Sequence, residues 1–118
     1  MKASNGTQQE LRLAFGVHRA PVDAPAKVLR QIESEAMALA VSMKAGGHKL
    51  ASVAAAIGKS EGYVSRMRKG LRPIPHRLVG PLCGATGSNL LRQYIDLQRA
   101  LEGACEVTRL AEQLRAAA

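Results

Sequence analysis

Aromatic residues are nearly absent from this sequence of 118 amino acids, which has one Phe, two Tyr and no Trp. Single-stranded nucleic acids usually stack their bases on aromatic side chains, so this scarcity argues against an RNA-binding or single-strand-binding module. Residues that favour strands are scarce, whereas 20 alanines and 14 leucines favour helices. The composition therefore predicts an all-α fold.

Long apolar runs and cysteine-rich patterns are also missing. No run reaches the roughly 18 apolar residues of a membrane-spanning helix, and the first residues lack the basic-then-apolar order of a secretory signal. Two cysteines, Cys83 and Cys105, are too few for a disulfide-stapled scaffold. A hydrophobic content of 47% is enough to bury a core. These features predict a folded cytoplasmic protein.

The sequence shows no pattern typical of catalysis or metal binding. His18, His48 and His76 have no metal-ligand spacing with the two cysteines, and a structural zinc site needs about four ligands. No Ser–His–acid or Cys–His arrangement stands out locally, and no glycine-rich loop with a lysine follows a strand. We therefore predict no catalytic residues, no metal and no cofactor.

Positive charge is plentiful but unevenly distributed. The chain has 17 Lys and Arg against 9 Asp and Glu, which gives a net charge of +8. The stretch from His48 to Gly80 holds seven basic residues and one acid, a net charge of +6, whereas Pro81–Ala118 has four of each and is neutral. The middle of the chain is therefore expected to meet a polyanion such as nucleic acid.

Apolar residues at helical spacing predict a bundle of four to five helices, the last of them long. The first is expected to begin with Asp23 as its N-cap and Pro25 in its first turn, and to end at Gly46. The next three are expected at 49–57, 60–69 and 76–85. Ser88 is expected to cap the long C-terminal helix.

The stretch from Leu50 to Gly70 carries the main functional signal because it predicts two short helices joined by a tight turn. Gly58 can adopt the left-handed conformation of such a turn, and Ala54 is small where the helices approach. Val64 and Met67 are expected to face inward. The opposite side of the second helix is polar and basic, as a helix in the DNA major groove requires. That side is formed by Ser60, Glu61, Gly62, Ser65, Arg66 and Lys69.

These residues resemble the lambda-repressor/Cro superfamily of phage and prophage regulators. Ala54, Gly58 and Val64 match the spacing of its helix-turn-helix. The string AAAIGKSEGYVSRMRKG is similar to phage CII-type activators, and GLRPIP resembles the G-x-R-x-P after the recognition helix of Cro/CI-type domains. The resemblance spans about Val28–Gly87. Lys59 departs from it, because an apolar residue usually follows the turn glycine.

The resemblance implies roles for individual residues. Five occupy base-contacting positions: Ser60, Glu61, Gly62, Ser65 and Arg66. Arg66 is expected to bind guanine through two hydrogen bonds, while Glu61 either accepts from cytosine or favours the helix N-terminus. Seven more residues are expected to meet phosphates: Lys49, Lys59, Tyr63, Arg68, Lys69, Arg72 and Arg77. Tyr63 has packing within the domain as its alternative.

The leucine stripe of the C-terminal helix has two interpretations, packing on the body or pairing with a second copy. We expect Leu90 to Leu101 to pack near the body and the remainder to help form a homodimer. The residues assigned to dimerisation are Leu97, Leu101, Val107, Leu110 and Leu114.

The chain is thus predicted to consist of a flexible N-terminal tail (1–24), a helix-turn-helix DNA-binding domain (25–87) and a C-terminal helix for packing and dimerisation (88–118). The expected function is sequence-specific binding of double-stranded DNA by a transcriptional regulator, repressor-type by resemblance, of phage, prophage or plasmid character. It would act in the bacterial cytoplasm at the nucleoid. The alternatives are an antitoxin-like or plasmid-maintenance module that binds a protein through the C-terminal helix, and a non-specific nucleoid protein.

Overall fold

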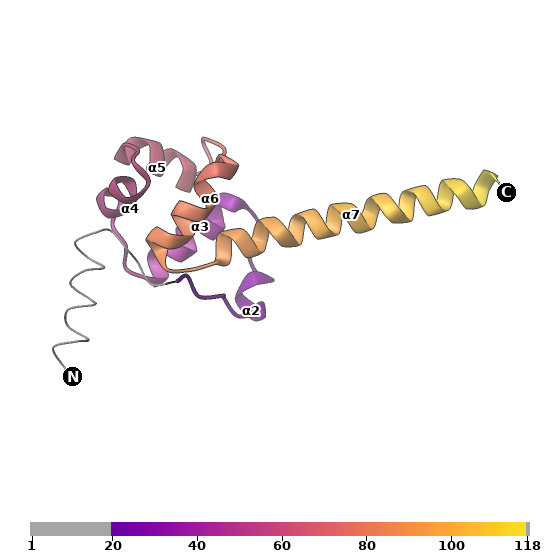
Figure 1. Cartoon of the computed structure of the whole chain (residues 1–118), viewed down its shortest axis with the longest axis horizontal. Coiled ribbons are helices and arrows are strands. Elements are labelled where there is room, and N and C mark those ends of the chain that lie inside the picture. The colour runs from indigo at the N-terminus through magenta and orange to yellow at the C-terminus, as the bar shows by residue number, and fades with distance from the viewer. Residues whose placement is uncertain (1–19, 118) are drawn as a thin grey trace.

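The computed structural model describes residues 20–117 and is all-helical apart from one isolated β-bridge. The helices are α2 (Ala26–Leu29), α3 (Glu35–Ala45), α4 (Leu50–Ile57), α5 (Glu61–Arg68), α6 (His76–Thr86) and α7 (Leu90–Ala117). The predicted all-α fold with a long C-terminal helix is confirmed (Figure 1). Residues 1–19, which hold most of the predicted tail, lie outside the described residues.

The first predicted helix is wrong in one respect, because the structure divides it into α2 and α3. The hydroxyl of Ser34 accepts a hydrogen bond from the backbone N–H of Met37 at 3.1 Å and caps a new helix. The hydroxyl of Tyr94 on α7 donates a hydrogen bond to the carbonyl of Glu33 at 3.0 Å, and so holds the segment between α2 and α3 against α7. Apolar spacing continues across the break, so it conceals the interruption. Asp23 caps neither helix.

The segment 21–24, at the end of the predicted tail, is hydrogen-bonded to the start of α7. Val22 donates to the carbonyl of Gly87 at 3.1 Å and accepts from the N–H of Asn89 at 2.9 Å. The Asn89 side chain donates to the Asp23 carboxylate at 2.8 Å. This part of the chain therefore belongs to the folded body.

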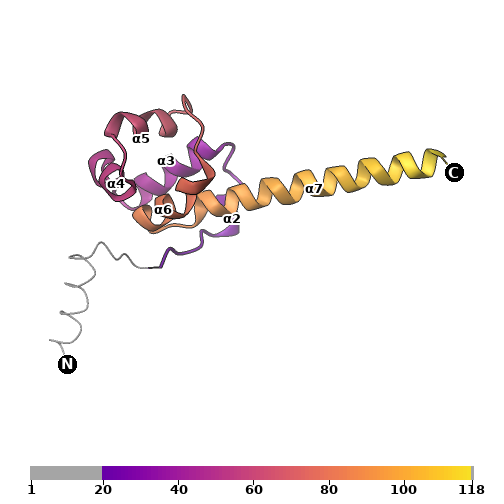
Figure 2. The ribbon, with the colours of Figure 1, turned by 45° about the horizontal axis from the view of Figure 1, so that its top comes forward.

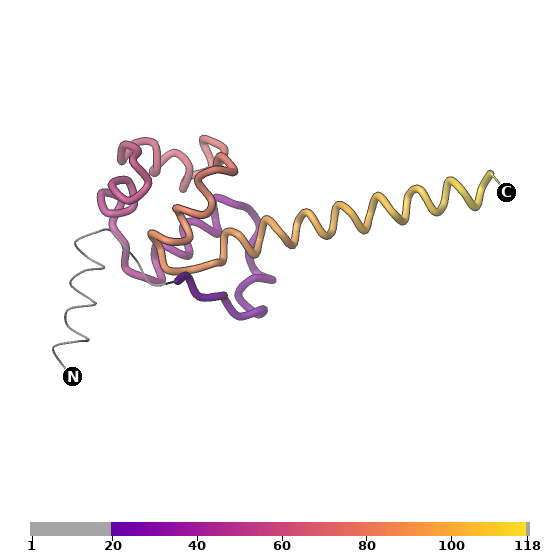
Figure 3. Tube along the Cα trace, viewed as in Figure 1, coloured from indigo at the N-terminus to yellow at the C-terminus, as the bar shows by residue number. Residues whose placement is uncertain are grey.

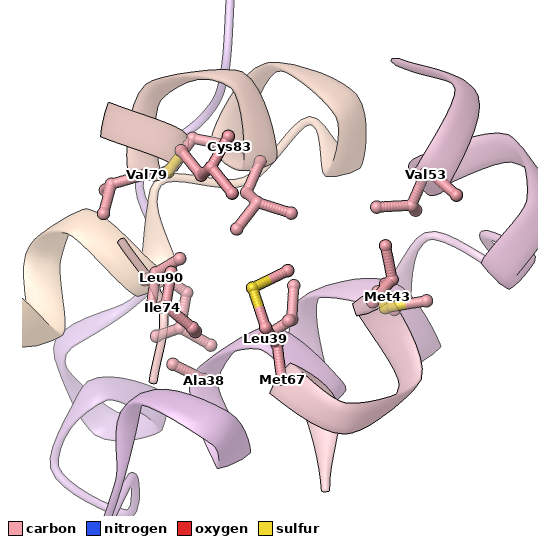
Figure 4. Packing of buried hydrophobic residues seen from close by; sticks show 14 of the residues in the cluster. Ala38, Leu39, Met43, Val53, Met67, Ile74, Val79, Cys83 and Leu90 are labelled. Carbon is pink, nitrogen blue, oxygen red and sulfur yellow. The ribbon is translucent and has the colours of Figure 1, made fainter. Parts of the chain in front are cut away.

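The core lies where α3, α4, α5, α6 and α7 meet (Figure 4). Its most deeply buried side chains are Leu39, Met43, Met67, Leu82, Leu90, Leu91, Val53, Val64 and Cys83. Burial raises the pKa of the Cys83 thiol. The left-handed Gly87, with φ 71°, ends α6, and Pro81 lies within that helix without ending it.

The body is compact, but α7 continues far beyond it (Figures 1 and 2). The described chain measures 70 × 37 × 24 Å, and its radius of gyration of 18.5 Å exceeds the roughly 13 Å of a compact 100-residue domain. The tube in Figure 3 shows that the yellow end of α7 lies far from α4 and α5. Every residue of 99–117 is exposed. No helix among the described residues is long and apolar enough to cross a membrane.

Candidate nucleic-acid interface

The α4–turn–α5 unit has the local geometry that the sequence predicts. Gly58 ends α4 in the left-handed conformation, with φ 70° and ψ 31°. The Ser60 hydroxyl accepts a hydrogen bond from the N–H of Tyr63 at 3.2 Å and starts α5. Val64 and Met67 are completely buried. Two local signals, a turn glycine and an N-cap, thus fix the angle at which α5 leaves α4.

The opposite side of α5 carries polar and basic side chains. Val64 and Met67 define its inward side, and the helical repeat directs Gly62, Arg66 and Lys69 away from the core. All three are exposed. Within residues 20–117, the cations between His48 and Gly80 form no ion pair with a carboxylate. This side therefore has unneutralised charge available to an anionic partner.

Tyr63 brings together two cations from different segments. The Nζ atom of Lys59, in the turn before α5, lies 5.3 Å from the centre of the Tyr63 ring. The guanidinium carbon of Arg72, in the segment after α5, lies 4.0 Å from the same centre. Both distances suit cation–π attraction. The ring thereby gathers positive charge at one edge of the outward side of α5.

Arg68 lies at the other edge of α5 and is half-buried. It lines a shallow groove together with Val41, Lys44 and His48. The Nε2 atom of His48 lies 2.9 Å from the carbonyl oxygen of Thr86, and this hydrogen bond holds the His48 ring at the end of α6. The predicted phosphate contact Arg68 therefore stands apart from the Tyr63 cluster.

The remaining five predicted contacts lie on or next to α5, just before α4 and in the first turn of α6. Ser60 already uses its hydroxyl oxygen as the cap of α5, and Glu61 lies in the first turn, where a carboxylate stabilises the helix dipole. Ser65 is half-buried on α5. Lys49 precedes α4 and Arg77 lies in the first turn of α6, and both are exposed. The predicted set thus extends from α5 to its neighbours on both sides.

The residues predicted for dimerisation lie on α7, away from this surface. Leu97 is half-buried where the helix leaves the body. Leu101, Val107, Leu110 and Leu114 are 51%, 68%, 50% and 74% exposed. These apolar side chains have no partner within residues 20–117.

No sequence pattern indicates that the Tyr63 ring brings Lys59 and Arg72 together. Tyr63 and Arg72 are nine positions apart, and their contact depends on the path of the chain after the left-handed Gly70, with φ 80°. Across residues 20–117, no three His, Cys, Asp or Glu side chains gather as metal ligands would.

No protein family model, curated protein or solved structure matches the chain. The function of the α5 surface therefore has to be inferred from its own residues.

Proposed function

We propose that this protein binds double-stranded DNA sequence-specifically, with α5 in the major groove, and regulates transcription as a homodimer. One observation carries the proposal: α5 is capped by Ser60 and buried on one side by Val64 and Met67, yet its other side is polar, basic and without ion-pair partners in the described chain. Any surface helix has a polar outer side, but here the charge is mostly of one sign, with seven basic residues and one acid between His48 and Gly80. A helix that enters the major groove requires such a surface.

The proposed base contacts lie along the outward side of α5. Arg66 is exposed, and its planar guanidinium matches the two acceptors of guanine. Gly62 lies one turn earlier and leaves room for the DNA to approach the backbone. Ser60, Glu61 and Ser65 complete this set, and the Ser60 hydroxyl can donate its proton to a base while its oxygen accepts the capping hydrogen bond from the N–H of Tyr63.

Phosphate contacts are proposed on either side of the base contacts. Lys59 and Arg72, whose positive charges lie over the Tyr63 ring, would contact phosphates of one DNA strand. Lys69 would add a positive charge next to Arg66. Lys49, Arg68 and Arg77 are the outer members of this set. Such contacts fix the position of the protein on DNA and make binding depend on salt.

Regulation would follow from occupying a promoter. Repression is proposed over activation on the habits of the lambda-repressor/Cro superfamily alone, since the string from Ala54 to Gly70 is similar to phage CII-type activators. Selection of bound sequences from a random pool of duplex DNA tests the proposal. We expect one motif containing guanine to be enriched, and Arg66→Ala to relax the preference at one position. The matched control, Arg109→Ala, removes an arginine from α7 and should preserve the motif. If no sequence is enriched, sequence-specific binding is refuted.

A second candidate is an antitoxin-like or plasmid-maintenance module, and the exposed apolar residues of α7 favour it. In that case a different protein would cover Leu101, Val107, Leu110 and Leu114. A purified stoichiometric complex that Leu110→Glu disrupts would support this candidate, and a chain that associates only with itself would contradict it.

A further inference from the structure

A shallow groove lies between the last turns of α3 and the end of α5, and we call it the α3–α5 groove. Its volume is about 870 Å³. The α3 residues that line it are apolar apart from Lys44, and they include Val41 and Ala45. The other side chains in the lining are those of His48 and Arg68, and no Asp or Glu of residues 20–117 lines the groove. The groove therefore combines an apolar surface with positive charge.

The positive charges of the groove are not neutralised by the described chain. Lys44 is exposed and Arg68 is half-buried, and neither forms an ion pair with a carboxylate within residues 20–117. The His48 ring is held in place, because its Nε2 donates to the carbonyl of Thr86 and a Cβ at Gly46 would overlap it. One wall of the groove is thus already ordered, which lowers the entropic cost of binding a partner.

From this combination we infer that the α3–α5 groove docks a short, acidic, amphipathic helix of a different protein. Apolar side chains of that helix would lie against Val41 and Ala45, and its Asp or Glu residues would pair with Lys44 and Arg68. A protein segment suits a shallow groove better than a small ligand does, because ligand pockets enclose most of the ligand's surface. A carboxylate at the half-buried Arg68 would gain more than one at an exposed cation, since partly buried pairs are screened less.

The charge of the chain argues against its own segments as the occupant. Residues 1–19 contain three basic residues and one acid, so they would add positive charge to the groove. The outer half of α7 is neutral, with three arginines and three glutamates between Arg99 and Ala117. Neither segment, from the same chain or from a second copy, matches the groove as an acidic helix does. The occupant also differs from the partner that the second candidate function places on α7.

The groove and the proposed base contacts lie on different sides of α5. At 3.6 residues per turn, Arg68 lies about 160° around the helix from Arg66, whereas Lys69 lies about 60° from it. Arg68 is one of the outer phosphate contacts proposed above, and the groove gives it a protein carboxylate as a second anionic partner. A chain bound to DNA through Arg66 could therefore hold another protein at its groove. This consequence rests on the proposed function, but the docking itself does not.

Selection from a random peptide library displayed on phage, against the full chain without DNA, tests the docking. We expect the enriched peptides to carry Asp or Glu beside apolar residues at helical spacing. The most enriched peptide is then synthesised with a fluorescent label and titrated by anisotropy. A selection that enriches nothing, or that enriches peptides without acidic residues, would overturn the inference.

Two variants of α5 test where the selected peptide binds. Arg68→Glu should weaken its binding by about tenfold or more, because an attracting charge is replaced by a repelling one. Arg66→Glu makes the same change on the other side of α5. It should alter the affinity by less than about twofold at about 0.15 M salt, where distant exposed charges are screened. Equal losses for the two variants would mean that the peptide is attracted by the basic chain in general, and would refute docking in the groove.

A second pair of variants avoids the half-buried Arg68. Ala45→Glu puts a carboxylate on an exposed residue of the groove and should also weaken the peptide by about tenfold. Ala55→Glu makes the same change on an exposed residue of α4 outside the groove and should preserve the affinity. Circular dichroism identifies the variants that fold.

Retained affinity in a folded Ala45→Glu variant would contradict the inference. So would analytical ultracentrifugation in which Ala45→Glu separates copies of the chain, because a second copy would then occupy the groove. Since no DNA is present, these results are separate from success or failure of the proposed DNA binding.

Discussion

α5 and the outer half of α7 both face solvent, but they present opposite chemistry to it. α5 buries Val64 and Met67 and exposes a basic side. α7 beyond residue 98 is neutral and exposes Leu101, Val107 and Leu110 instead. A positive surface attracts a polyanion and an exposed apolar surface favours protein contacts, so the contrast supports the proposal that α5 meets DNA and the outer half of α7 meets protein.

The largest effect is expected from the same substitution made at the two ends of α7. Leu91 is 2% exposed and Leu114 is 74% exposed. Leu91→Ala should lower the free energy of unfolding by about 2–5 kcal/mol, because it leaves a cavity, whereas Leu114→Ala should change it by less than about 0.5 kcal/mol. Urea unfolding in a Leu110→Glu background, which disrupts the proposed homodimer, measures both. Equal losses would mean that the outer half of α7 packs on its own body.

The second prediction compares two arginines, one in each region. Arg66→Ala should weaken binding to the selected DNA site by about 1–3 kcal/mol, since it removes two hydrogen bonds to a base. Arg109→Ala removes the same charge from α7, where Arg109 pairs with Glu106, and should leave that affinity nearly unchanged. Lys69→Ala should weaken all sequences alike and reduce the salt slope by about 1. Fluorescence anisotropy at several salt concentrations, on selected and random duplexes, measures these changes. Identical losses for Arg66→Ala on both duplexes would contradict its assignment to a base.

How far the fold could be predicted depends on whether the signals are local. The bounds of α4 and α5 follow from Gly58 and Ser60, because a left-handed turn and a helix cap act within a few residues. The break between α2 and α3 was missed, although Ser34 is also a cap, because apolar spacing continues through it.

Contacts between distant segments could not be predicted. The bonds between Val22 and the start of α7, and the stacking of Arg72 on Tyr63, arise only when the chain returns to the same place. The basic residues of the candidate surface were identified from charge alone, whereas their grouping around Tyr63 required the structure.

The third prediction separates stability from binding at Gly62. A Cβ added there would lie 3.5 Å from the Nη1 atom of Arg66, an ordinary contact, so the fold does not require glycine. Gly62→Ala should therefore raise the free energy of unfolding by up to about 1 kcal/mol, because alanine favours helices. It should weaken DNA binding by about 1 kcal/mol if DNA approaches the backbone closely. Urea unfolding and anisotropy on one preparation measure both, and a variant that gains stability without losing affinity would show that DNA does not approach Gly62.

The smallest effect is expected at Tyr63, where two substitutions distinguish the ring from the hydroxyl. Tyr63→Phe keeps the surface on which Lys59 and Arg72 stack, whereas Tyr63→Leu removes it. An exposed cation–π contact contributes about 0.5–1 kcal/mol, so Tyr63→Leu should weaken DNA binding by that amount, and Tyr63→Phe should weaken it less. Anisotropy at low salt, where phosphate contacts count most, is the appropriate measurement. Equal losses for the two variants would mean that the hydroxyl, bound to a phosphate, is the only part of Tyr63 that DNA binding requires.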